Sequence, residues 1–176
     1  MYSVWTQDSP VGPLTITVTS DGVRKVEFES ERQGRNTLKL ASGGPAPEVV
    51  EAFENYFAGD PEPLDELKID YSLTKGPRYR QVLKLLRSDT GFGQTVTYGQ
   101  LAEAAEIPGA AQLVGQIMGS NPTPIIVPCH RVVAADGSLG GFSGGLDNKR
   151  ILFRIEAISP RGGGWAKQDP DQTTLF

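Results

Sequence analysis

The chain has 176 residues, of which 38% are hydrophobic, and a formal net charge of −4. This length suits one domain or two small ones, and the lack of a run of about 20 apolar residues excludes a transmembrane span. A single cysteine and a single histidine exclude an intrachain disulfide and a four-ligand zinc site built from Cys and His. The N-terminus also lacks the features of a signal peptide, so we expect a cytoplasmic protein with no metal, cofactor or membrane partner.

The first part of the chain predicts a small α+β module over residues 1–76. Two β-rich runs, 13–19 and 23–28, flank Ser20-Asp21-Gly22, where Asp-Gly is a hairpin signal. A loop over 33–47 and a helix over 47–59 follow, then a break at 60–63 and a short strand over 67–72. The apolar residues of that helix recur at helical spacing: Val49, Val50, Phe53, Tyr56 and Phe57. No candidate active site lies in this module.

Residues 77–160 predict a second, mainly helical domain. Pro77 suits the first turn of a helix that continues through RYRQVLKLLRS. Thr97 can cap a second helix, and the turn at 107–109 leads into a third, over 110–120. Two short helices joined by a Gly-containing turn outline a helix-turn-helix, although an ordinary helical hairpin has the same outline.

Charge and helix composition both bear on a nucleic-acid partner. Residues 1–75 carry 7 Lys/Arg against 13 Asp/Glu, whereas residues 76–161 carry 9 against 6. The basic second half could meet phosphates, or be no more than a solvated surface. The helix over 110–120 has no Lys or Arg, and its small residues are Ala110, Ala111, Gly115 and Gly119. Such a face permits close approach to a minor-groove wall or close packing inside the protein.

The single cysteine and histidine stand together in PTPIIVPCHRVV as Cys129 and His130. Pro122, Pro124 and Pro128 argue against a central strand here. Next come a hairpin signal at Asp136-Gly137, a glycine-dense loop over 140–145 and a final helix over 146–158. That loop could cover a ligand or be a simple connector. After Pro160 the tail, 161–176, lacks a pattern for regular structure.

These residues suit a nucleophile–base–orienter set. Cys129 supplies the sulfur, His130 a base that titrates near neutrality, and Glu156 a carboxylate that can orient the imidazole. A buried, inert cysteine is the alternative. Because adjacent side chains in a strand point to opposite faces, a Cys–His couple here requires an irregular backbone or a bridging water.

The region from Pro77 to Glu156 resembles the O6-alkylguanine-DNA alkyltransferases. The resemblance rests on PCHR at 128–131, SNP at 120–122, TYGQLA at 97–102, PGAA at 108–111, VG at 114–115 and GGFSGGL at 140–146. It implies an α+β protein with an N-terminal ribonuclease-H-like α/β module and a C-terminal mainly helical domain with a helix-turn-helix. The N-terminal half resembles the family only in outline.

The resemblance also implies a function and a set of roles. Double-stranded DNA with O6-alkylguanine would be bound at its minor groove and the base flipped. Cys129 would take the alkyl group irreversibly, once per monomeric molecule. His130 would accept the thiol proton through a water and Glu156 would hold His130, while Asn121 would tie the helix-turn-helix to the active-site segment. Tyr98 would contact the flipped nucleotide and donate toward the guanine oxygen.

The remaining implied positions fall into two groups. DNA contacts are expected from Thr97, Ala110, Ala111, Gln112, Gly115, Met118 and Arg131. Base contacts are expected from Tyr98, Val132, Phe142, Ser143 and Gly144, with main-chain groups around Val132 and Ser143 recognising the base. Two positions depart from the family pattern: Gln112 stands where the family usually has an intercalating arginine, and Phe142 where several relatives have tyrosine.

The sequence is also compatible with two rival functions and with one further partner. A lesion-sensing DNA binder with an inert Cys129 would recruit other repair factors, and a cysteine hydrolase or acyltransferase would turn over repeatedly on small substrates. Residues 172–176, QTTLF, resemble the Gln-x-x-Leu-Phe peptides that dock on the bacterial sliding clamp. A tail can present Leu175 and Phe176 to a hydrophobic pocket.

Overall fold

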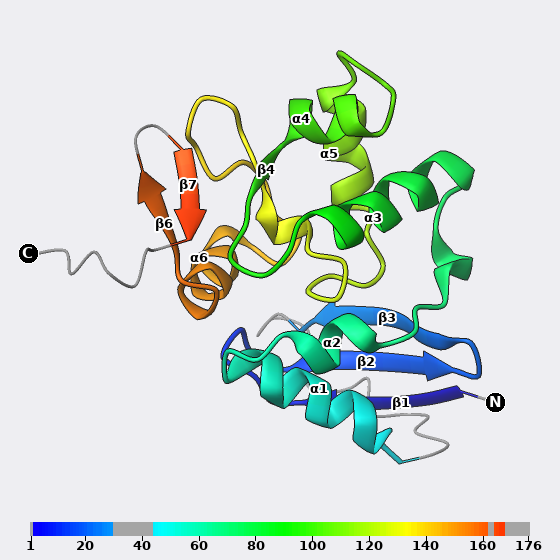
Figure 1. Ribbon diagram of the computed structural model, residues 1–176. Helices are drawn as coiled ribbons and strands as arrows, with labels where there is room; N and C mark the ends of the chain where they lie inside the picture. The colour runs from blue at the N-terminus through cyan, green and yellow to red at the C-terminus, as the bar shows by residue number, and fades with distance from the viewer. Residues whose placement is uncertain (1, 30–43, 162–163, 168–176) are drawn as a thin grey trace, which may run out of the picture.

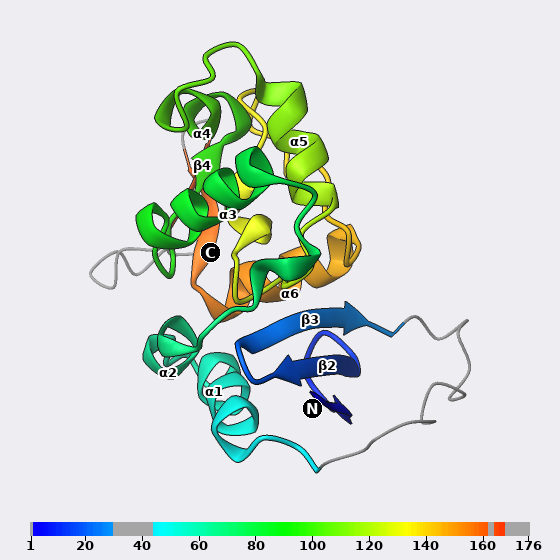
Figure 2. The ribbon, with the colours of Figure 1, turned by 90° about the vertical axis from the view of Figure 1, so that its right-hand side faces the viewer.

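The computed structural model describes residues 2–29, 44–161 and 164–167. The sheet of β1, β2 and β3 and the helices α1 and α2 lie at one end of the molecule, and a larger, mainly helical part lies at the other (Figures 1 and 2). This is the mixed α+β architecture that the sequence predicted. No helix within these described ranges combines the length and apolarity that a membrane span requires.

The N-terminal sheet is antiparallel, with strand order β1-β2-β3. Its strands are β1 (Tyr2–Gln7), β2 (Leu14–Thr19) and β3 (Gly22–Phe28). Thr19 pairs with Gly22 across the turn, which confirms the predicted hairpin. Gly22 has a φ of +129°, and a Cβ there would lie 2.4 Å from the Lys68 carbonyl oxygen, so this turn requires glycine. The strand β1 was not predicted from the sequence.

Two helices cover one face of this sheet (Figure 1). The predicted helix is confirmed as α1 (Pro47–Phe57), whereas α2 (Glu62–Glu66) forms where only a chain break was expected. The predicted strand over 67–72 is wrong: Ile69 makes one isolated bridge to Val23, and Tyr71–Leu73 form a 3-10 helix, η1. The loop predicted over 33–47 lies mostly outside the described residues.

The C-terminal part, from residue 77 onward, contains three helices that pack around one apolar cluster. Its helices are α3 (Pro77–Asp89), α4 (Tyr98–Ala104) and α5 (Ala111–Gly119). Thr97 caps α4 in a capping box: its hydroxyl accepts from Gln100 N, and the Gln100 side chain accepts from Thr97 N. Gly109 closes the α4–α5 turn at a φ of +78°, so the helix-turn-helix outline is present.

The remaining elements complete the site and correct two predictions. They are β4 (Val96–Thr97), η2 (Cys129–Arg131), β5 (Val132–Val133), α6 (Leu146–Ile155), β6 (Ile158–Arg161) and β7 (Gly164–Lys167). Asp136-Gly137 forms a turn, in which the Gly137 N–H donates to the Ala134 carbonyl oxygen at 3.3 Å, but no hairpin, since no strand lies between β5 and α6. The strand β5 instead pairs in parallel with β4. The tail is not wholly irregular either, since β6 and β7 pair antiparallel. Residues 168–176, including the predicted clamp peptide, lie outside the described residues.

Candidate active site

Cys129 begins η2, a single 3-10 turn that follows Pro128. The Arg131 N–H donates to the Pro128 carbonyl oxygen at 2.9 Å, which closes this turn. With about three residues per turn, successive side chains leave the backbone in different directions. The irregular backbone required for a Cys–His couple is therefore present, and the prediction that this segment is not a central strand is confirmed.

A pocket of about 200 Å³ reaches Cys129. Its wall is formed by Tyr98, Gly115, Met118, Gly119, Cys129, Gly141, Phe142 and Ser143. The cysteine itself is only 3% exposed. The sulfur is thus enclosed by protein, yet it borders a cavity rather than packed hydrocarbon alone.

Tyr98 forms part of this wall from the first turn of α4. A Cβ built on Gly140 would lie 2.9 Å from the Tyr98 phenol oxygen, so the glycine-dense loop passes directly over the ring. Burial raises the pKa of Tyr98, against a hydrogen bond involving the backbone of Gly141. The phenol therefore stays protonated near neutrality and can donate a hydrogen bond into the pocket.

In the residue after the cysteine, the His130 imidazole meets a buried carboxylate. His130 Nε2 lies 2.6 Å from Glu156 Oε1, and both side chains are fully buried. The predicted pairing of these residues is present, with Glu156 immediately after α6. Because an ionised carboxylate only accepts, Nε2 carries the proton and Nδ1 is left as the acceptor nitrogen. Nδ1 has no hydrogen-bond partner among the described residues.

The structure overturns one predicted DNA contact, Arg131. Its side chain is 4% exposed and turns inward, where Nε and Nη2 donate to the two oxygens of Glu156 at 2.9 and 3.1 Å. Nη1 donates to the Thr90 carbonyl oxygen at 2.6 Å. A guanidinium held this way cannot reach a phosphate, so Arg131 is a structural partner of the carboxylate.

The protonation states follow from these contacts. Burial alone would raise the pKa of Glu156, but His130 and Arg131 outweigh burial and hold it well below the usual range. Burial lowers the pKa of His130, in opposition to Glu156, so the imidazole is neutral at pH 7. Burial raises the pKa of Cys129, against Asn121 and Lys149, so the thiol is protonated at rest. Thiolate formation therefore requires a nearby base.

Asn121 links the end of α5 to the segment before the cysteine. Its amide nitrogen donates to the Val127 carbonyl oxygen at 3.0 Å, and its amide oxygen accepts from Thr123 N at 3.1 Å. These bonds hold the turn between the helix-turn-helix and η2. The contact geometry therefore suits the tying role that the resemblance implied.

The helix α6 carries a buried lysine that was not among the predicted site residues. Lys149 is fully buried, and its ammonium group donates to the carbonyl oxygens of Val132, Leu139 and Gly141. It thereby fastens the glycine-dense loop to β5. Burial lowers the pKa of Lys149 to about 8, in opposition to Cys129. Its place on the apolar face of α6, three and four residues before Leu152 and Phe153, was the available signal.

The other predicted site residues divide by position. Gly115, Met118, Phe142 and Ser143 line the pocket, whereas Gln112 is exposed, and Ala110 and Ala111 are half-buried at the start of α5. Val132 and Gly144 are not among the described residues that line it. The Val132 carbonyl accepts from Lys149 at 2.7 Å, so its predicted contact with the base is not confirmed.

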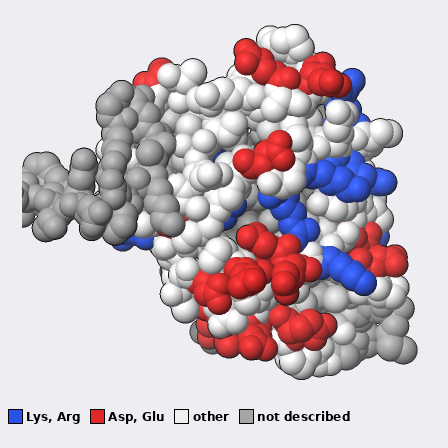
Figure 3. Space-filling model, in the orientation of Figure 1, with Lys and Arg blue, Asp and Glu red and all other residues white. Residues whose placement is uncertain are grey.

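The surface charge differs between the two parts of the molecule. On the face of Figure 3, acidic side chains gather over α1 and α2, and basic ones lie over α3. This arrangement agrees with the acidic first half and basic second half of the sequence. A negatively charged polymer is therefore repelled from the N-terminal module.

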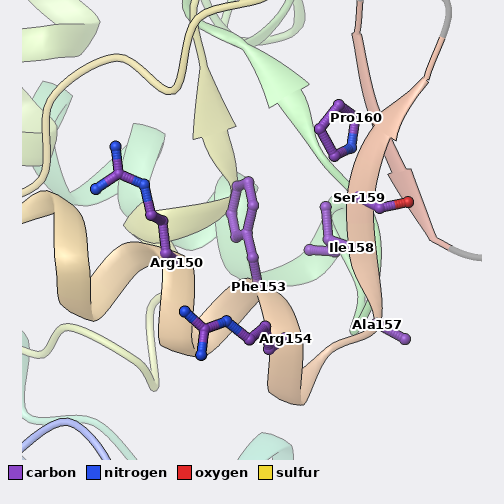
Figure 4. Close-up of a pocket in the computed structure, with 7 residues that line it drawn as sticks. All are labelled: Arg150, Phe153, Arg154, Ala157, Ile158, Ser159 and Pro160. Carbon is purple, nitrogen blue, oxygen red and sulfur yellow. The ribbon is translucent and has the colours of Figure 1, made fainter. Parts of the chain in front are cut away.

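A larger hollow of about 390 Å³ lies between α6 and β6 (Figure 4). It is lined by Arg150, Phe153, Arg154, Ala157, Ile158, Ser159 and Pro160. It holds no member of the Cys–His–Glu set. Among the described residues, no group of three or more His, Cys, Asp and Glu side chains could hold a metal ion. The smaller pocket at Cys129 is therefore the candidate active site.

The sequence matches two protein-family models. Residues 77–158 match the 6-O-methylguanine DNA methyltransferase DNA binding domain, and residues 2–71 match its ribonuclease-like domain. The methylated-DNA–protein-cysteine methyltransferase of Mycolicibacterium paratuberculosis is 38% identical, covering 100% of this chain and 99% of the relative. The Haemophilus influenzae enzyme of that name is 35% identical, covering 85% and 83%.

Solved structures agree with these relatives. Mycobacterium tuberculosis OGT in complex with DNA matches with a TM-score of 0.72 and 34% identity, covering 88% of this chain and 92% of that one. The O6-methylguanine-DNA methyltransferase of Pyrococcus kodakaraensis matches with a TM-score of 0.65 and 26% identity, covering 90% and 100%. The predicted resemblance is confirmed across both parts of the fold. This chain belongs to the 6-O-methylguanine DNA methyltransferase family.

Proposed function

We propose that this chain repairs O6-alkylguanine in DNA by transferring the alkyl group to Cys129. The observation that carries the proposal is the enclosed cysteine, which lines a pocket and directly precedes His130 of the buried His130–Glu156 couple in η2. A sulfur nucleophile suits attack on an alkyl carbon, and this chemistry requires no metal. The family membership and the DNA complex of the Mycobacterium tuberculosis relative support the same reaction.

The proposed reaction is one displacement. The thiol proton of Cys129 passes through a water to His130 Nδ1, which has no protein partner among the described residues. The sulfur then forms a bond to the alkyl carbon while the bond from that carbon to guanine O6 breaks. The electron pair leaves on O6, toward which Tyr98 donates a hydrogen bond. The product thioether is stable, so each molecule reacts once.

The enclosure of the sulfur supports base flipping. A cysteine that is 3% exposed cannot reach a base inside a duplex, so the base must enter the pocket. We propose that α5 enters the minor groove, which is about 6 Å wide, with Ala110, Ala111 and exposed Gln112 leading. Gln112 fills the gap that the extruded base leaves. The protein would act as a cytoplasmic monomer.

Intact-protein mass spectrometry tests the transfer. Incubation with excess duplex containing O6-methylguanine should add one methyl group, located to the peptide with Cys129, and then stop. The Cys129→Ala variant should bind the same duplex without gaining mass. Binding without mass gain by the unaltered chain would instead favour a lesion-sensing protein. Repeated turnover of small thioesters would favour a hydrolase.

We also propose that residues 172–176 bind a bacterial sliding clamp. The support is the sequence QTTLF alone, in which Leu175 and Phe176 suit a hydrophobic pocket. Deletion of these five residues should abolish retention on immobilised clamp while methyl transfer stays unchanged. Equal retention of the shortened chain would end this proposal.

A further inference from the structure

The N-terminal module contributes one side chain to the charged centre of the C-terminal domain. Tyr56, in the penultimate position of α1, is fully buried. Its phenol O–H donates to Glu156 Oε1 at 2.6 Å, across 100 residues of sequence. The same oxygen lies 3.4 Å from His130 Nε2. A group from the ribonuclease-like part of the fold therefore touches both the carboxylate and the imidazole.

The phenol is held in place by aromatic packing. Its ring meets Phe57 and Phe92 edge-on, with centroid distances of 5.3 and 5.9 Å. Phe92 directly precedes Gly93, whose N–H donates to Glu156 Oε2 at 3.0 Å. The edge-on ring contacts hold the phenol, and the backbone N–H of Gly93 holds the carboxylate, so the two groups are fixed relative to each other. Such packing leaves the hydroxyl little freedom to point elsewhere.

The direction of the hydrogen bond is set by charge. Glu156 is ionised, so the phenol must be the donor and Oε1 the acceptor. Burial and then the Glu156 charge raise the pKa of Tyr56 well above its ordinary value, which keeps the O–H proton in place. Oε1 therefore accepts from Tyr56 and from His130 Nε2–H at equal distances of 2.6 Å.

We propose that Tyr56 is a positioning residue of the alkyl-transfer site, and that its phenol O–H sets the tautomer and proton affinity of His130 through Glu156. This inference rests on the proposed function. Oε1 also accepts from Arg131 Nη2 at 3.1 Å, and the closer phenol donor further weakens the pull of the carboxylate on a proton at the imidazole. His130 then stays neutral, with Nδ1 free to accept the thiol proton from Cys129.

Several titratable or charged groups lie around the His130 imidazole, and the variant that tests the proposal changes only one of them. The groups that act on the imidazole are Glu156 after α6, Lys149 of α6 and Arg131 of η2. The Tyr56 phenol of α1 lies beside it, and Cys129 precedes it in η2. The carboxylate of Asp65 in α2 acts on Tyr56. The Tyr56→Phe variant keeps the aromatic ring and removes only the hydroxyl. Any shift in His130 titration is therefore assigned to the lost donor.

Nuclear magnetic resonance can read this directly, because His130 is the only histidine in the sequence. We expect the pKa of His130 to rise in Tyr56→Phe by on the order of one unit, since a hydrogen bond to a charged group is strong enough for that shift. The acid limb of the methyl-transfer rate should move to higher pH by the same amount. DNA affinity should stay unchanged.

Two comparisons keep the inference falsifiable. The matched control Tyr71→Phe removes a phenol hydroxyl from a half-buried residue of η1 and should leave the His130 titration unchanged. In the unaltered chain, imidazole nitrogen shifts should show the proton on Nε2. A proton on Nδ1, or an unshifted titration in Tyr56→Phe, would overturn the inference. Both readings are made without DNA, so a failure of methyl transfer itself is recognised separately.

Discussion

Replacing Arg131 with methionine separates the buried role found in the structure from the DNA contact that the sequence suggested. The change removes the two hydrogen bonds that Arg131 donates to Glu156 and the bond to the Thr90 carbonyl, and leaves a carboxylate buried without its cation. Breaking one partner out of a buried ion pair costs about 3–5 kcal/mol. For a chain of this size, that loss lowers Tm by roughly 6–20 °C.

Thermal and urea unfolding followed by circular dichroism measure this loss. The control is Arg150→Met, which breaks an exposed pair with Asp147 and should change stability by less than about 0.5 kcal/mol. DNA binding supplies the second readout. An arginine that neutralises a phosphate adds about 0.9 to the logarithmic salt slope, so an unchanged slope is expected for Arg131→Met.

The pH dependence of folding stability provides a further test of the buried Arg131–Glu156 pair. The pKa of Glu156 is held below its unfolded value, taken as 4.5, so the stability that it contributes is present above pH 4.5 and is lost as the pH falls further. The deficit of Arg131→Met should therefore be complete at pH 7 and shrink below pH 4.5. A loss under about 1 kcal/mol together with a reduced salt slope would refute the buried assignment of Arg131.

Three further predictions concern single positions. Gln112→Arg should bind DNA more tightly, with a salt slope steeper by about 0.9, and equal slopes measured by anisotropy would contradict a DNA-facing Gln112. Gly140→Ala places a Cβ 2.9 Å from the Tyr98 phenol at a φ of +68°, and should slow methyl transfer about tenfold in single-turnover assays. The pKa of Lys149 falls from 10.5 to about 8 on folding, so the unfolded chain binds more protons between these pH values. The stability of the unaltered chain relative to Lys149→Met should therefore increase as the pH rises from 8 to 10.5. That comparison is made by urea titration in a Cys129→Ala background, and a flat difference would argue against a charged, buried Lys149.

Local patterns predicted the elements whose causes are local. The apolar spacing along α1 and α3, the capping residue Thr97 and the Asp-Gly turn at residue 21 all act within a few residues, and the structure confirms them. The failures have a common cause as well. At Asp136-Gly137 the turn forms, but β5 pairs with the distant β4. No local signal in the sequence predicts which strand β5 will pair with.

The site itself was only half predictable for the same reason. Cys129, His130 and Glu156 were identified from residue type and from the family resemblance. The inward turn of Arg131 depends on the 3-10 geometry of η2 and on where Glu156 lies after α6. One available signal was that Arg131 stands between apolar runs, where a solvated cation is unexpected. The partnership of Tyr56 with Glu156 joins two modules and leaves no trace in either local pattern.

The resting charges of this site explain why the reaction would wait for a substrate. Glu156 and Arg131 neutralise each other, His130 is uncharged and the Cys129 thiol keeps its proton. Proton transfer would create a thiolate and an imidazolium inside the protein, where burial opposes both charges. Glu156 can stabilise that imidazolium only in part, because Arg131, Tyr56 and Gly93 already donate to its oxygens. The thiolate would therefore stay scarce until its sulfur bonds to an alkyl carbon in the pocket and the negative charge leaves on guanine O6. The placement of the base would then control the reaction more than the strength of the nucleophile.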